Sequence, residues 1–151
     1  MAKIDTKTIS KLREKTGAPV VRVKQVLDEV GGDVKKATSI LKKEGFEKAS
    51  KREGRETKAG VVETYIHATK NSGATVVLRV ETDFVARNPE FHKLAREIAM
   101  QVTAMDPKNE KELLSQQYIR DPKKTVGDLI KEGRVKFGEN IELREFKRFE
   151  I

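Results

Sequence analysis

The chain has 151 residues, of which 37% are charged and 36% hydrophobic, and it carries a formal net charge of +8 and no cysteine. This length allows one ordinary domain or two small modules and excludes a large enzyme. The lack of cysteine excludes disulfides, thiol nucleophiles and thiolate zinc sites, and no segment reaches membrane-spanning length, so we expect a cytoplasmic protein that does not bind membranes.

Three short helices are expected in residues 1–45, which we predict to form one module. Asp5 or Thr6 caps the first helix, Pro19 begins the second, and Asp33 caps the third. Valines at helical spacing give the second helix a stripe that faces the core, and Val21 lies off this stripe.

Residues 46–60 mix charges with few apolar side chains, which predicts a charged connector, either irregular or a solvated helix. Apolar residues then alternate with polar ones over 61–68 and again over 76–81, with a turn-rich segment between them. This pattern is typical of a β-hairpin. Asn88 and Pro89 supply the cap and the first residue of a long helix.

The remaining segments complete a core domain that we predict to span residues 61–151. Residues 106–124 suggest a short helix between turns, Thr125 caps another helix, and the chain ends in a strand. The simplest assembly is an α+β fold in which helices cover a three-stranded antiparallel sheet. In that last strand Phe146 has the opposite parity to Ile141, Leu143, Phe149 and Ile151.

No pattern of catalytic, metal-binding or cofactor-binding residues is visible. The glycines at 31 and 32 are explained by a helix end, and a phosphate-binding loop would need a different pattern. His67 and His92 have no partner at metal-ligand spacing. We therefore expect no metal, no cofactor and no catalytic site.

The net charge and the small helical module leave a second class of function open, that of a basic ribosome- or nucleic-acid-associated protein. Acidic residues are interleaved with the basic ones, and Tyr65 and Tyr118 are far apart in a chain without tryptophan. We expect no specific nucleic-acid partner. Strong salt dependence and broad binding to RNA or DNA would favour this alternative.

Four sequence motifs, in order along the chain, resemble those of the elongation factor Ts family. The most specific is ETDFVARN at residues 81–88, between a predicted strand and the long helix. The others are LREKTGA at 12–18, GGD at 31–33 and FGENI at 137–141.

The resemblance implies an N-terminal three-helix module similar to ubiquitin-associated domains, followed by a core of the family's dimerisation type. It also implies a guanine nucleotide exchange factor that binds elongation factor Tu in its GDP-bound and nucleotide-free states. The loop would disturb the magnesium and phosphate site of Tu through Thr82, Asp83, Phe84 and Val85. The N-terminal module would dock through Leu12, Val20 and Val21.

A local reading of the loop is the alternative: Asp83 caps a helical turn and Phe84 fills the space between strand and helix. A further alternative is an inert adaptor that binds Tu without accelerating nucleotide release.

The chain departs from the family pattern in two respects. Residues 19–24 read PVVRVK where the family usually has GMMDCK. Long family members also place two core subdomains against each other, whereas this chain encodes one, which implies a homodimer with Phe146 as a contact. Because Lys147 stands where short members can carry a cysteine, the dimer would be non-covalent. The alternatives for Phe146 are a bulge that turns it inward or an exposed lone aromatic.

Overall fold

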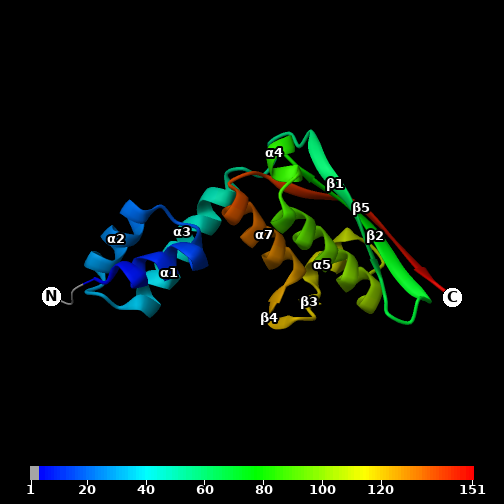
Figure 1. Ribbon diagram of the computed structural model, residues 1–151, viewed down its shortest axis with the longest axis horizontal. Coiled ribbons are helices and arrows are strands. Elements are labelled where there is room, and N and C mark those ends of the chain that lie inside the picture. Colours follow the sequence, from blue (N-terminus) through cyan, green and yellow to red (C-terminus); the bar gives the residue numbers. More distant parts are fainter. Residues whose placement is uncertain (1–3) are drawn as a thin grey trace. The chain divides into compact units, whose positions relative to one another are not determined.

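A computed structural model describes residues 4–151 of the chain. The chain forms two compact units, one ending at Arg52 and the other comprising Glu53–Ile151 (Figure 1). The helices and strands, in chain order, are α1 (Thr6–Thr16), α2 (Val20–Glu29), α3 (Val34–Ser50), β1 (Ala59–Ile66), β2 (Ser72–Val80), α4 (Asp83–Ala86), α5 (Pro89–Met105), α6 (Glu110–Ser115), β3 (Gln117–Tyr118), β4 (Asp121–Thr125), α7 (Val126–Phe137) and β5 (Ile141–Glu150).

The first unit contains three helices whose ends follow from local chemistry. The Asp5 carboxylate caps α1 by accepting a hydrogen bond from the Lys7 amide at 3.2 Å, and Gly17 ends the helix with a φ of 70°. Asp33 caps α3 in the same manner. The three helices bury a common core of Ile9, Leu12, Val23, Val26, Leu27, Ala37 and Leu41. The similarity to ubiquitin-associated domains stays a prediction.

Helix α3 is longer than the sequence pattern suggests. It continues through Gly45 to Ser50, so the first unit extends into the segment 46–60 that was expected to be a connector. A glycine inside a helix costs about 1 kcal/mol relative to alanine. That is too little to end a helix of 17 residues that packs Ala37 and Leu41 into the core.

Most of the net charge lies in the first unit. Of the 32 basic and 24 acidic residues of the chain, 14 and 7 fall in residues 1–52, which leaves 18 and 17 in residues 53–151. The second unit is therefore almost neutral. A strong positive charge on a small unit favours encounter with acidic surfaces.

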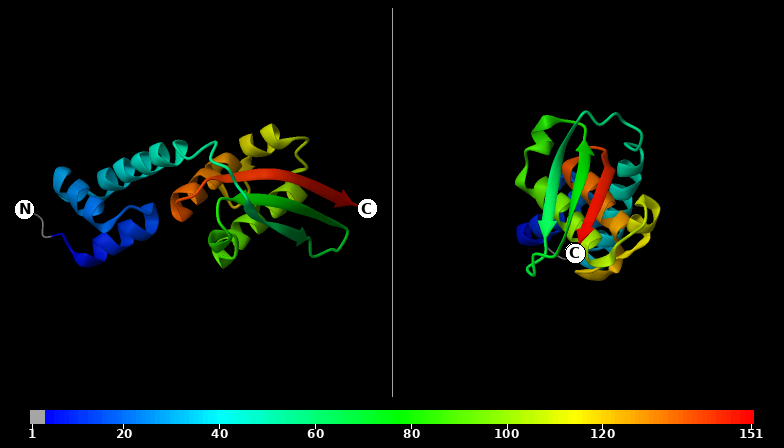
Figure 2. Two further views of the ribbon diagram at one scale, coloured as in Figure 1. Left: turned by 90° about the horizontal axis from the view of Figure 1, so that it is seen from above. Right: turned by 90° about the vertical axis from the view of Figure 1, so that its right-hand side faces the viewer.

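The second unit confirms the predicted α+β architecture. Its sheet is antiparallel, with strand order β1-β2-β5, and α5 and α7 lie behind the sheet in the right-hand view of Figure 2. The central strand β2 buries alternate residues against these helices: Ala74, Val76, Leu78 and Val80. On β1, Val62 and Ile66 occupy the opposite face and are 65% and 56% exposed.

Strand β5 contains a β-bulge. Val77 pairs with Glu145, but the next residue, Leu78, pairs with Leu143, so Arg144 is an extra residue without a partner on β2. An extra residue reverses the in-and-out alternation of every side chain that follows it.

The bulge corrects the predicted orientation of the C-terminal aromatic residues. Phe146 is partly buried and packs against the core of the second unit, whereas Phe149 is 56% exposed and Ile151 is fully exposed. The expectation that Phe146 points away from the helices is therefore wrong, as is the expectation that Phe149 and Ile151 face them. The alternative of a bulge that turns Phe146 inward describes the structure.

Residues 106–124 contain the expected short helix, α6, and also an unpredicted two-stranded sheet of β3 and β4. The buried Gln101 of α5 ties this hairpin down: its amide donates to Gln117 O at 3.0 Å and accepts from the Ile119 amide at 3.0 Å. Across residues 4–151, no helix has the length and apolar character that crossing a membrane requires.

Candidate functional site

The loop at residues 81–88 joins β2 to α5 and contains the one-turn helix α4. Thr82 has extended backbone angles and is the N-cap of this helix, because its hydroxyl accepts from the Val85 amide at 3.4 Å. The cap is therefore Thr82, and the local reading in which Asp83 caps the turn is wrong.

The four side chains of α4 divide between the core and the solvent. Val85 and Ala86 are 6% and 7% exposed and belong to the core of the second unit, while Phe84 is 86% exposed. Phe84 therefore does not fill the space between strand and helix. Aromatic residues are enriched at protein interfaces, so the exposed ring is a candidate contact for a partner.

Asp83 lies beside Phe84 on the exposed side of the turn. It is the acidic residue of the first turn of α4, and its side chain is exposed. Val85, by contrast, is 6% exposed and anchors the turn in the core, and its role in partner contact stays a prediction.

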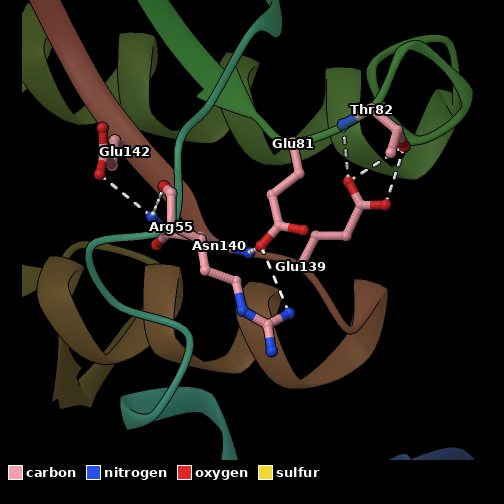
Figure 3. Close-up of polar contacts among 6 residues, drawn as sticks. All are labelled: Arg55, Glu81, Thr82, Glu139, Asn140 and Glu142. Atoms are coloured by element: carbon pink, nitrogen blue, oxygen red, sulfur yellow. Dashed lines mark hydrogen bonds and ion pairs between the residues drawn. The ribbon is translucent and has the colours of Figure 1, made fainter.

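Glu139, in the turn between α7 and β5, holds the first end of the loop. Its carboxylate accepts from the Thr82 amide at 3.0 Å and from the Thr82 hydroxyl at 2.8 Å (Figure 3). These bonds join residues 57 positions apart in the sequence. Charged acceptors form stronger hydrogen bonds than neutral ones, so this contact is a specific brace for the loop.

The neighbouring residues Arg55, Glu81, Asn140 and Glu142 extend this polar network (Figure 3). Glu81 accepts from the Asn140 amide at 3.0 Å and pairs with Arg55 at 3.8 Å. The Asn140 side chain is fully buried and donates to Arg55 O at 2.9 Å and to Glu142 at 3.0 Å. The network thus connects the start of the second unit, the end of β2 and the start of β5.

His92 holds the other end of the loop. Its Nε2 lies 2.7 Å from Ala86 O, and because a carbonyl oxygen only accepts hydrogen bonds, Nε2 carries a proton in this contact. Asn88 caps α5 by accepting from the Glu90 amide at 2.9 Å. The loop is therefore tied both to the β5 side and to the first turn of α5.

The three predicted docking residues of the first unit have different environments. Leu12 is 2% exposed and lies in the helical core, and its role in docking stays a prediction. Val20 and Val21, in the first turn of α2, are 37% and 67% exposed. The exposure of Val21 agrees with its place off the core-facing stripe.

A charged groove of about 530 Å³ lies between α5, α7 and the β3–β4 hairpin. Its carboxylates are matched by cations: Lys136 contacts Glu90 at 2.9 Å and thereby holds the pKa of that carboxyl below its usual range. Burial and a hydrogen bond to Glu97 raise the pKa of Tyr118.

Residues 4–151 contain no cluster of three or more His, Asp or Glu side chains that is arranged to hold a metal ion.

Two functional contacts escaped the sequence patterns. Glu139 belongs to the FGENI motif, which pointed to the residue without indicating its role, and His92 was considered as a metal ligand, for which it lacks a partner at suitable spacing. The Glu139 contact depends on tertiary structure, because Glu139 reaches Thr82 only after β5 pairs with β2, whereas the His92 contact joins residues six positions apart.

Comparison with known proteins places these features in a family. The profile described as Elongation factor TS matches residues 81–151, which include the loop and both of its braces. The chain is similar to elongation factor Ts of Aquifex aeolicus, with 43% identity over 152 residues, 97% of this chain and 52% of that protein. It is also similar to elongation factor Ts of Leptospira biflexa and of Thermodesulfovibrio yellowstonii. Identity is 37% in both, over 98% of this chain and 98% and 96% of those proteins.

The chain thus spans about half of the Aquifex protein but nearly all of the other two. The Leptospira alignment covers 193 positions, more than the 151 residues of this chain. It therefore includes positions at which the Leptospira protein has residues and this chain has none.

Proposed function

Because the chain belongs to the elongation factor Ts family, we propose that it is a guanine nucleotide exchange factor that binds GDP-loaded elongation factor Tu and speeds GDP release. One observation carries the proposal: Phe84 is 86% exposed on a one-turn helix that is braced at both ends. Such a residue is pre-organised to enter a partner.

Burial of Phe84 in the partner supplies binding energy that drives a change in the partner's conformation. A phenylalanine buries 150–250 Å², so moving its exposed part into an apolar site provides about 3–5 kcal/mol at 25 cal/mol per Å². That energy shifts the conformation of Tu only if the pocket exists in the state with weak nucleotide binding. Asp83 brings a carboxylate to the same place and is suited to disturb the magnesium ion of the GDP site.

Loss of the magnesium ion removes the largest local positive charge from the GDP phosphates, and GDP then dissociates faster. No covalent step is required of this chain. Because coupling between two ligands is reciprocal, incoming nucleotide weakens the binding of this chain by the factor by which this chain weakens nucleotide binding.

The first unit provides the docking contact. Val20 and Val21 form an exposed apolar pair on α2, and the excess of basic residues in this unit favours encounter with an acidic surface. These valines are smaller than the methionines usual in the family, so each buries less area on docking.

The chain also forms a non-covalent homodimer, through the sheet face that the helices leave open. Val62, Ile66 and Phe149 are all more than half exposed on this face, and Ile66 and Phe149 line a groove of about 410 Å³. Ile66 pairs with Gly73, which in turn pairs with Phe149, so the two side chains flank this glycine on the same face of the sheet. A second copy buries these side chains.

The exchange role is tested by measuring the release of a fluorescent GDP analogue from Tu with and without this protein. Phe84→Ala should abolish most of the acceleration. Met105→Ala is the matched control, because Met105 is 48% exposed and lies at the far end of the 17-residue helix α5. Normal exchange by Phe84→Ala, or an equal loss in both variants, would contradict the proposed role.

The dimer is tested separately by sedimentation at micromolar concentration. Phe149→Ser should shift the protein towards monomer, and this shift should depend on concentration. A wild-type protein that is monomeric at all concentrations would contradict the dimer and would mean that a single core engages Tu.

A further inference from the structure

The Thr82 hydroxyl has two roles at once. It accepts from the Val85 amide as the cap of α4, at 3.4 Å, and it donates to a carboxylate oxygen of Glu139 at 2.8 Å. The Thr82 amide uses the other carboxylate oxygen, at 3.0 Å. A hydroxyl that donates to a charged group becomes a better acceptor, so the carboxylate strengthens the cap.

Helix α4 needs such support because it has only four residues. A single helical turn fixes several backbone dihedrals for one hydrogen bond and is unstable without tertiary contacts. Val85 and Ala86 anchor the turn to the core from below, and His92 holds its last carbonyl. Among residues 4–151, Glu139 is the only residue whose side chain accepts hydrogen bonds from Thr82.

Glu139 is itself held on both sides. Gly138 ends α7 with a φ of 68°, a backbone conformation that favours glycine, and Asn140 is fully buried and bonded to Glu81. The carboxylate therefore stands on a turn whose backbone is fixed by the core.

From this geometry we infer that Glu139 is a positioning residue that sets the direction in which Phe84 leaves the protein. It acts through Thr82 and does not contact the partner. The inference rests on the proposed exchange function. Loss of the carboxylate should therefore lower the maximal rate of GDP release without changing the docking affinity that the first unit provides.

The charge and shape of the carboxylate matter. Thr82 presents two donors, and a carboxylate offers two acceptors, whereas a glutamine would place an N–H₂ donor opposite one of them. Glu139→Gln keeps the size of the side chain but loses the match. Glu110→Gln is the control, because Glu110 is an exposed glutamate of the same unit, on α6.

Mobility of the loop is measured without the partner. The chain contains no tryptophan, so Phe84→Trp introduces a single tryptophan at the tip of the loop, whose emission is excited separately from that of the two tyrosines. In time-resolved anisotropy, Glu139→Gln should enlarge the fast component of Trp emission, and Glu110→Gln should leave it unchanged. Thr82→Val removes the hydroxyl at constant size and should act like Glu139→Gln, with no further effect when the two are combined.

Exchange is then measured with Phe84 in place. Glu139→Gln should lower the maximal rate of GDP release about three- to tenfold, at an unchanged half-saturating concentration. An equally rigid probe in Glu139→Gln, or a mobile probe with an unchanged maximal rate, would overturn the inference. If the unmodified chain does not accelerate GDP release, the proposed function fails, and the anisotropy alone decides whether Glu139 orders the loop.

Discussion

The β-bulge in β5 places two phenylalanines that lie three positions apart in opposite environments, one packed against the core and one exposed. Because Arg144 is an extra residue, Phe146 packs against the core and Phe149 is 56% exposed. A regular strand starting from the buried Ile141 would give the reverse arrangement. We predict that Phe146→Ala destabilises the protein and that Phe149→Ala does not, when both are measured as monomers.

The magnitudes follow from burial. Truncating a fully buried phenylalanine to alanine costs about 3–5 kcal/mol, so the partly buried Phe146 should contribute roughly 1.5–2.5 kcal/mol. Phe149 should contribute less than about 1 kcal/mol. For a unit of this size, a loss of roughly 2 kcal/mol lowers the Tm by about 8–16 °C.

Urea unfolding at low protein concentration measures both variants, with the slope of the transition as a check that the denatured state is unchanged. Repeating the experiment at high protein concentration distinguishes the stability that comes from dimerisation from that of the folded monomer. Only Phe149→Ala should then lose stability that depends on concentration. The reasoning is refuted if Phe149→Ala is the more damaging change at low concentration.

Three further predictions concern other parts of the chain. Gly60→Ala should destabilise the second unit by about 1–2 kcal/mol in denaturant unfolding, because a Cβ there would lie 2.6 Å from the Leu78 carbonyl oxygen of the paired strand. The Arg22 guanidinium lowers the pKa of the Glu44 carboxyl below 4.5. The stability from this pair is therefore present above that pH and lost as the pH falls through the lowered pKa. In acid unfolding followed by circular dichroism, Glu44→Gln should make the stability depend less steeply on pH in this range. Deleting residues 1–52 should raise the half-saturating concentration for GDP release from Tu more than it lowers the maximal rate, and should weaken the dependence of affinity on salt. An unchanged affinity would show that the first unit does not dock.

Much of the fold was predictable because the signals are local. Asp5, Asp33 and Asn88 cap helices through bonds to amides within three residues, and Thr125 forms a capping box with Asp128. The alternation of β2 likewise identified its buried face. In each case the residues that determine the structure lie next to one another in the sequence.

The failures of prediction have a common physical cause: each depends on contacts between distant segments. No residue near Arg144 marks the bulge, which is visible only in the pairing of β5 with β2. The exposure of Phe84 depends on Val85 and Ala86 filling the core in its place.

The bond between Thr82 and Glu139 also sets an order of events during synthesis. Residues 81–88 leave the ribosome well before the turn at Glu139 and the strand that follows it, since 57 positions separate the two partners. Domains generally fold as units once their sequence is complete, and contacts between distant segments form late. A nascent chain therefore lacks the brace until its last strand pairs with β2, so the Thr82 end of the loop is not held by Glu139 while the chain is unfinished.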